Sequence, residues 1–241
     1  SVMGWCFNPM SAVELAKHCR DIGLVAIEGI GAEHYPAVRK LGLKISLVSS
    51  HGFAKGPINR DHHEFCISKL KSSIDLAVEN ECENVITFTG MREKGISDEQ
   101  GSRNCVECWK QVVAYAEEKK VNLCLEHLNS RDGSHPMKGH PGYFGDDVDF
   151  CVDLIRKVDS PRMKLLFDIY HVQIMNGDVI RRIEQCKDVI GHIHTAGNPG
   201  RAELDAKQEI FYPAIMHKLI EIGYDGYVGH EFIPTRDPQA G

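Results

Sequence analysis

Four polar residues stand at the ends of apolar, strand-like segments in the second half of the chain. They are Glu126, Asp168, His194 and Glu231. A carboxylate at the end of a buried strand is costly to bury unless a positive charge meets it. Three carboxylates and one imidazole form an oxygen-rich ligand set that suits Mg²⁺ or Mn²⁺, with Co²⁺ and Zn²⁺ as alternatives. We therefore predict that these four residues bind one divalent metal ion.

Such a site suits reactions in which a weakly acidic proton leaves a carbon next to a carbonyl group. Moving the carbonyl to the neighbouring carbon, or inverting the centre beside it, passes through an enediolate. A divalent cation that contacts the carbonyl and hydroxyl oxygens stabilises this negative charge. We predict that Glu126 and Glu231 are both metal ligands and catalytic proton carriers, one on each side of the enediolate. General acid–base transfer of this kind contributes about 10² to 10⁴ in rate.

Four further residues are candidates for binding the substrate. His171, three residues after Asp168, either donates a hydrogen bond to a substrate oxygen or only orients its loop. Arg201 is either a solvated loop residue or the anchor for a substrate carboxylate, since guanidinium and carboxylate match as a planar pair. His51 and Arg92, in the loops after the third and fourth strand-like segments, are weaker candidates at the same rim.

The elements that must position these residues alternate along the chain. We expect strands at residues 2–7, 24–28, 43–49, 85–89, 121–126, 164–168, 190–195 and 227–231. We expect helices at residues 11–22, 33–41, 60–81, 101–119, 146–158, 178–186 and 212–222. Strands separated by helices at about 30-residue spacing predict parallel, right-handed βαβ units.

Eight such strands predict an α/β fold, a single (β/α)8 TIM barrel that spans residues 1–241 as one domain. Active sites of this fold lie at the carboxyl ends of the strands. The four candidate ligands fall on four consecutive strands, which are neighbours in a closed barrel, so their side chains can converge. The eighth helix is truncated or absent, or a partner covers the gap.

The loop at residues 127–145 is long and rich in Gly, His and Pro. A long loop without secondary structure in a compact domain is usually functional or disordered. We predict a lid that closes over the substrate and excludes water. In the neighbouring strand at residues 190–195, His192 shares a face with His194 and is expected one layer deeper, as a packed histidine.

Composition excludes several classes of protein. The net charge of −6 and the scattered basic residues argue against a nucleic-acid surface. The sequence lacks the run of about 18 apolar residues that a membrane span needs, and we expect no signal peptide. The nine cysteines are odd in number and several fall in apolar patterns, so we predict free thiols and a cytoplasmic protein. Cys105 and Cys108 lack the second pair of a zinc site.

Four segments resemble the xylose-isomerase-like sugar isomerase/epimerase family: FDIYHVQ at residues 167–173, HIH at 192–194, NPGR at 198–201 and GHE at 229–231. The resemblance implies a TIM barrel with one divalent cation held by Glu, Asp, His or Gln, and Glu. These positions correspond to Glu126, Asp168, His194 and Glu231. Within the family the similarity is greatest to hydroxypyruvate isomerases. Two features depart from them: His194 stands where they often carry Gln, and AELD at residues 202–205 replaces a His-Glu-Pro-Gly type of sequence.

The resemblance implies an isomerase that interconverts hydroxypyruvate and 2-hydroxy-3-oxopropanoate (tartronate semialdehyde). The alternative is a ketose 3-epimerase or another sugar isomerase on the same metal site; Arg201 favours the small acid. A metal-dependent endonuclease needs more metal ligands and a basic groove, which the net charge opposes. A non-catalytic sugar-binding barrel does not need the glutamate pair. We expect a small hydroxy-keto acid or sugar as substrate, no nucleic acid or membrane partner, and possible homo-oligomers.

Overall fold

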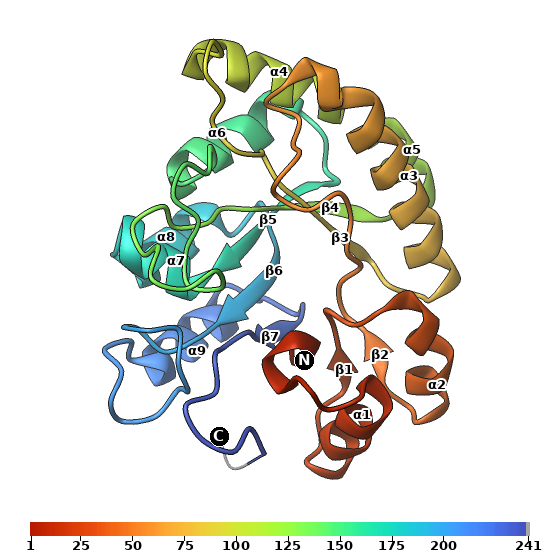
Figure 1. Ribbon diagram of the computed structural model, residues 1–241, viewed down its shortest axis with the longest axis vertical. Helices are drawn as coiled ribbons and strands as arrows, with labels where there is room; N and C mark the ends of the chain where they lie inside the picture. Colours follow the sequence, from red (N-terminus) through yellow and green to blue (C-terminus); the bar gives the residue numbers. More distant parts are fainter. Residues whose placement is uncertain (240–241) are drawn as a thin grey trace.

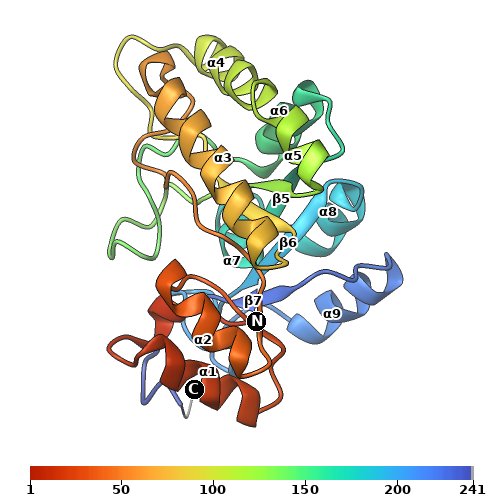
Figure 2. The same cartoon turned by 90° about the vertical axis from the view of Figure 1, so that its right-hand side faces the viewer.

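The computed structural model describes residues 1–239. Its strands lie in the middle of the molecule and its helices surround them, as Figure 1 and Figure 2 show from two directions. Neighbouring strands pair in parallel. The strands are β1 (Ala26–Ile27), β2 (Lys44–Ile45), β3 (Asn84–Thr87), β4 (Asn122–Glu126), β5 (Met163–Asp168), β6 (Ile190–Thr195) and β7 (Val228–His230).

The helices begin at capping residues that the sequence provides. Ser11 accepts a hydrogen bond from the Glu14 N–H at 3.3 Å, and Asp147 accepts one from the Phe150 N–H at 2.8 Å. The α-helices are α1 (Ala12–Asp21), α2 (Tyr35–Lys40), α3 (His63–Glu79), α4 (Asp98–Lys110), α5 (Val113–Lys119), α6 (Val148–Val158), α7 (Ile169–Met175), α8 (Val179–Cys186) and α9 (Tyr212–Glu221). Short 3₁₀ helices are η1 (Gly4–Phe7), η2 (Ala32–His34) and η3 (Arg60–His62).

Two sheets and a few isolated bridges close the strands into a ring. β1 pairs with β2, and β3 to β7 form the second sheet in chain order. Val48 pairs with Val85, which joins the segment after β2 to β3. The first residues of the chain pair with both His230 and Glu28, and the N-terminus therefore lies beside β7 in both views (Figure 1, Figure 2). This ring confirms the predicted TIM barrel.

The predicted strand at residues 2–7 is wrong beyond Met3. The Gly4 N–H still donates to the Glu28 carbonyl at 2.7 Å, but residues Gly4–Phe7 then form η1. This turn brings the Trp5 indole N–H to Glu231 Oε1 at 3.0 Å. Glu231 lies 226 residues away along the chain. This contact, which local sequence does not reveal, is formed where the predicted strand becomes a 3₁₀ turn.

One helix also differs from the prediction. The helix expected at residues 101–119 begins at Asp98, because Ser97 accepts from the Gln100 N–H at 3.2 Å. It then divides into α4 and α5, since the N–H groups of Gln111 and Val112 donate to carbonyls three residues back, which tightens the turn.

The sequence does not predict α7, which begins directly after β5. Asp168 caps it by accepting a hydrogen bond from the His171 N–H at 3.1 Å. Its first four residues, 169–172, are all buried, so the segment lacks the alternation of apolar and polar faces that identifies a helix in a sequence.

Side chains of the central strands alternate between two hydrophobic clusters. Leu125 belongs to the large cluster that the strands share with the helices. Cys124 and Leu166 belong to a smaller cluster on the opposite face, toward the barrel axis. Because side chains repeat every two residues along a strand, Glu126 and Asp168 face the axis as well.

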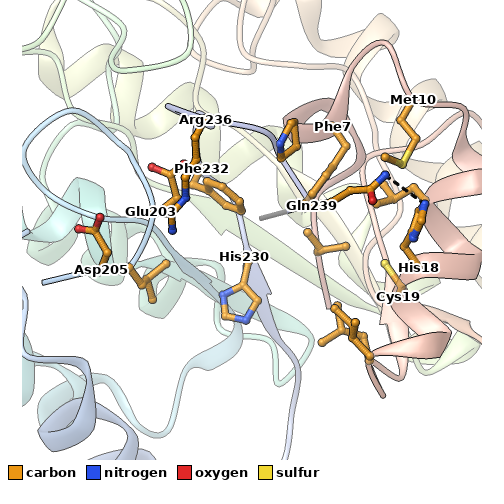
Figure 3. Close-up of a pocket in the computed structure, with 16 residues that line it drawn as sticks. Phe7, Met10, His18, Cys19, Glu203, Asp205, His230, Phe232, Arg236 and Gln239 are labelled. Carbon is orange, nitrogen blue, oxygen red and sulfur yellow. Dashed lines mark hydrogen bonds between the residues drawn. The ribbon is translucent and has the colours of Figure 1, made fainter. Parts of the chain in front are cut away.

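The ring of helices has a gap beside α1. Through residue 239, no helix follows β7, as the sequence predicts. A groove of about 630 Å³ lies there, between α1 and the last described residues, with Phe7, Met10, Cys19 and Phe232 on its walls (Figure 3). The Gln239 side chain lies 3.2 Å from His18 Nε2 across one end of the groove.

The structure also tests the predictions of free thiols and of no membrane span. All nine cysteines are buried and unpaired. Cys105 and Cys108 both lie in α4, where they pack in the interior. Within residues 1–239, the helices are too short or too polar to cross a membrane.

Candidate active site

The four candidate metal ligands meet at the carboxyl ends of four neighbouring strands. Glu126 ends β4, Asp168 ends β5, His194 lies near the end of β6, and Glu231 directly follows β7. One ligand atom from each residue lies within 4.8 Å of the others, and all four residues are buried. The convergence expected from strand order is therefore present in the structure.

These residues leave polar atoms that no hydrogen bond satisfies. His194 Nδ1 lies 2.9 Å from Glu231 Oε2 and 3.5 Å from Glu126 Oε1. Within the described residues, neither His194 Nδ1 nor Glu126 Oε1 has an aligned hydrogen-bond partner. Buried polar groups normally have partners. Unpaired donors and acceptors that face one point, with three carboxylates among them, fit a bound divalent cation.

Arg201 lies inside the site rather than on a solvated loop. Its guanidinium is buried, and Nη2 donates to Glu231 Oε2 at 2.6 Å and to Asp168 Oδ2 at 3.2 Å. Nη1 donates to the carbonyl of Met137 at 2.5 Å. These contacts occupy both terminal nitrogens, and Nε is buried without a partner among the described residues.

The two glutamates differ in acidity because their neighbours differ. Burial, together with the negative charge of Glu231, raises the pKa of Glu126 to about 7, against the lowering effect of His194. Burial opposes ionisation of Glu231 too, but the positive charges of Arg201 and His194 lower its pKa to about 2. Burial also raises the pKa of Asp168, although Arg201 counteracts this. Two carboxyl groups whose pKa values are pushed apart are suited to opposite roles in proton transfer.

A fully buried carboxylate, Glu28, lies behind the ligand set. Its oxygens lie 2.8 Å from His192 Nε2 and 3.5 Å from His194 Nε2, and one accepts from Ser46 Oγ at 3.0 Å. His192 is fully buried one layer below His194, as expected. We did not single out Glu28 from the sequence, although it ends the predicted strand at residues 24–28 in the same way as the ligands.

His171 lies next to the ligand set with one ring nitrogen unsatisfied. Its Nε2 is 3.6 Å from Asp168 Oδ2 and has no hydrogen-bond partner within residues 1–239. Burial and the charge of Arg201 hold the pKa of His171 well below its usual range, so the ring is neutral. Its Nδ1 accepts hydrogen bonds from Asn129, which we did not single out from the sequence.

The structure does not bring His51 and Arg92 to the site. His51 is buried, with Nε2 3.0 Å from Thr87 Oγ1 and Nδ1 3.2 Å from the Lys55 carbonyl. Arg92 is exposed and forms ion pairs with Asp98 and Asp146. Their predicted substrate contacts have no support in this geometry, because other groups already occupy their polar atoms.

A cavity of about 360 Å³ opens beside the candidate ligands. Glu126, His194, Glu231 and Arg201 form its polar wall. Its other walls are mostly apolar and include Trp5, Phe53, Phe88, Leu128, Met137 and His140. Met137 and His140 belong to the loop at residues 127–145, which therefore borders the cavity as a lid would.

A family model described as the xylose isomerase-like TIM barrel matches residues 11–241. The chain belongs to the xylose isomerase-like TIM barrel family. That membership confirms the resemblance carried by the four sequence segments, and it agrees with the ring of strands.

Curated members of the xylose isomerase-like family share part of this sequence. The 2-oxo-tetronate isomerase of Cupriavidus necator is 36% identical over 121 residues, which are 50% of this chain and 44% of that protein. The hydroxypyruvate isomerase of Escherichia coli K12 is 30% identical over 154 residues, 64% of this chain and 57% of that protein. The matched segment is thus about half the length of each of these relatives.

A solved structure supports the fold over the whole chain. The protein described as AP endonuclease, family 2, from Brucella melitensis superposes with a TM-score of 0.84 at 23% identity. The match covers 100% of this chain and 93% of that one. At this identity the likeness shows the shared barrel.

Proposed function

We propose that this chain is a metal-dependent isomerase that interconverts hydroxypyruvate and 2-hydroxy-3-oxopropanoate. The observation that carries the proposal is the pair of buried glutamates, Glu126 and Glu231, which converge with Asp168 and His194 so that one ligand atom of each lies within 4.8 Å of the others. Relatives named 2-oxo-tetronate isomerase and hydroxypyruvate isomerase support the substrate class, a small acid with adjacent carbonyl and hydroxyl groups.

The proton transfers of the proposed reaction are divided between the two glutamates. Glu231 removes a proton from C3 of hydroxypyruvate, and Glu126 delivers to C2 a proton that it takes from water. The hydroxyl proton passes from the oxygen on C3 to the oxygen on C2, which completes the isomerisation without an oxidant or reductant. The two glutamates then exchange their protons with water, and the reverse reaction exchanges their roles.

Four residues would hold the cation: Glu126, Asp168, His194 and Glu231. A divalent cation bound there supplies positive charge that stabilises the two adjacent oxygens of the enediolate. Arg201 keeps Asp168 and Glu231 in place, and we propose that its charge also attracts the substrate carboxylate. His171 Nε2 donates to a substrate oxygen, and the loop with Met137 and His140 keeps water out.

An activity panel tests the proposal. The protein is stripped of metal, reconstituted with Mg²⁺, Mn²⁺, Co²⁺ or Zn²⁺, and assayed with hydroxypyruvate, 2-oxo-tetronate and neutral ketoses in deuterated water. We expect metal-dependent turnover of the acids with deuterium at the receiving carbon. In Arg201→Ala, KM should rise more for an acid than for a ketose. An equal rise would show that Arg201 only positions Asp168 and Glu231 and does not bind the substrate carboxylate.

The second candidate is a ketose 3-epimerase. His194 favours it, because ketose epimerases of the family carry histidine at this ligand where hydroxypyruvate isomerases often carry glutamine. The same panel separates the two candidates: turnover of ketoses with inversion at C3, and none of hydroxypyruvate, would replace the first proposal with the second.

The cellular compartment and the oligomeric state stay predictions. The nine unpaired thiols favour a reducing compartment such as the cytoplasm. The expectation of homo-oligomers can be tested by light scattering.

A further inference from the structure

Asn129, the third residue after β4, binds one nitrogen of His171 twice. Its backbone N–H lies 3.1 Å from His171 Nδ1, and its side-chain Nδ2 lies 2.7 Å from the same atom. A backbone N–H can only donate, so Nδ1 must accept and carries no proton. The ring proton of His171 is therefore on Nε2.

The amide orientation of Asn129 follows from its other partners. Oδ1 accepts from the Asp132 N–H at 3.0 Å, and Nδ2 also donates to the Lys138 carbonyl at 2.6 Å. The reverse orientation would place two acceptors together at Lys138 and two donors together at Asp132. Hence Nδ2, the donor, is the side-chain atom that faces His171.

The proton on His171 Nε2 lies beside the candidate ligand Asp168. This atom is buried, lies 3.6 Å from Asp168 Oδ2, and has no hydrogen-bond partner among residues 1–239. Leaving a buried N–H unsatisfied is unfavourable. An oxygen of a substrate bound beside Asp168 would satisfy it.

Asn129 also holds together the loop that borders the cavity. Its carbonyl accepts from the His140 N–H at 2.7 Å, in addition to the side-chain bonds to Asp132 and Lys138. Gly139 packs so closely that a Cβ there would lie 2.3 Å from Asn129 Oδ1. The loop at residues 129–140 thus depends on one buried asparagine, and it carries Met137, which contacts Arg201.

We propose that Asn129 is a positioning residue that fixes His171 as an Nε2–H donor and clamps the loop at residues 129–140 against the substrate cavity. One residue, Asn129, therefore determines both the conformation of the loop at residues 129–140 and the position of the His171 ring proton. The part that concerns catalysis rests on the proposed isomerase function; the part that concerns the ring proton and the loop does not.

The ring proton is measured directly with ¹⁵N-labelled protein. Long-range ¹H–¹⁵N spectra identify which nitrogen of His171 is protonated, and His171→Gln assigns the signals. We expect a proton on Nε2 alone in the wild type. In Asn129→Asp, the backbone N–H still faces Nδ1 and keeps the ring proton on Nε2, but the side-chain donor is lost, so the ¹⁵N signal of Nδ1 should shift. A wild-type proton on Nδ1, or an unchanged Nδ1 signal in Asn129→Asp, overturns the proposal.

Asn122→Asp is the matched control at the amino end of β4. Its amide donates to Asn84 Oδ1 at 2.9 Å and accepts from Arg162 at 3.1 Å, away from the site. We expect the His171 spectrum and kcat to stay as in the wild type. In Asn129→Asp, kcat should fall about 10- to 100-fold, as when a partner that orients a functional histidine is lost.

The outcomes separate this proposal from the isomerase assignment. A shifted Nδ1 signal with full kcat would overturn the link between His171 orientation and catalysis. If the wild type shows no isomerase activity on any acid but the spectra change as expected, the assigned reaction fails and the positioning role of Asn129 stands.

The loop clamp has its own measurement. Trypsin can cleave after Lys138, and Asn129→Ala removes the side-chain bonds to Lys138 and Asp132. Cleavage there should be several-fold faster in Asn129→Ala than in the wild type under native conditions. Equal cleavage rates, with the variant shown to be folded by circular dichroism, would overturn the clamp.

Discussion

At the scale of single residues, Glu126 and Glu231 face the same ligand set from different surroundings. Glu231 accepts hydrogen bonds from the Trp5 indole and the Arg201 guanidinium. Glu126 Oε1 has no hydrogen-bond partner within the described residues. One carboxyl group is therefore stabilised as an anion and the other is not, which is the asymmetry that a directed proton transfer requires.

Replacing either glutamate by glutamine should remove a proton carrier and weaken a metal ligand. We expect Glu126→Gln and Glu231→Gln each to lower kcat by at least about 10² to 10⁴. Steady-state assays measure kcat, and solvent deuterium exchange measures the proton transfer. Glu64→Gln, on the exposed face of α3, is the control and should be fully active. Full activity in either site variant would contradict the proton-transfer assignment.

The opposite shifts also predict how the stability of the metal-free protein depends on pH. The pKa of Glu231, lowered from 4.5 to about 2, means that the folded state binds fewer protons than the unfolded state in that window, so stability rises with pH there. The pKa of Glu126, raised from 4.5 to about 7, has the opposite sign, so its contribution falls as pH rises through that window. Thermal unfolding with chelator should show less loss of stability between pH 4.5 and pH 7 in Glu126→Gln.

At the scale of elements, strand periodicity determines which side chains face the barrel axis. His192 and His194 lie two residues apart on β6 and share that face, with ring centroids 5.0 Å apart. Glu28, at the carboxyl end of the β1 segment, lies against both imidazoles. A carboxylate behind a metal-binding histidine orients its ring and raises its basicity as a ligand.

We therefore expect Glu28→Gln to weaken metal binding without changing the ligand set. Loss of such a carboxylate typically lowers metal affinity about 10- to 100-fold. Isothermal titration of the metal-free protein with Mn²⁺ measures the change. Ser46→Ala removes only one of the groups that donate to Glu28 and should have a smaller effect. Equal Mn²⁺ affinity in the wild type and Glu28→Gln would show that the carboxylate serves packing alone.

At the scale of the whole molecule, the site depends on closure of the ring. The first residues of the chain pair with β7, and this places Trp5 against Glu231. Carboxylates from β4, β5 and the end of β7 then share one small volume. Their mutual repulsion opposes folding unless positive charge is present, and Arg201 and His194 supply it in the metal-free protein.

A divalent cation should therefore stabilise the whole fold. A ligand that binds only the folded state at 100 times its Kd adds about 2.7 kcal/mol to the free energy of unfolding. We expect Tm to rise with Mn²⁺ or Mg²⁺ and to fall again with chelator, measured by differential scanning fluorimetry. In Asp168→Asn the rise should be much smaller. The same metal-induced rise in both proteins would place the cation elsewhere.

Local patterns in the sequence predicted the alternation of strands and helices, the barrel and the convergence of the four candidate ligands, because strand period and βαβ order are properties of neighbouring residues. Other features depend on residues far apart in the chain, and only the tertiary structure decided them. Arg201 bonds Glu231 across 30 residues, and Asn129 bonds His171 across 42. His51 and Arg92 carry suitable groups, yet closure of the ring leaves them engaged with other partners. Residue type and spacing therefore indicate the candidate ligands, whereas the three-dimensional packing decides which donor meets which acceptor.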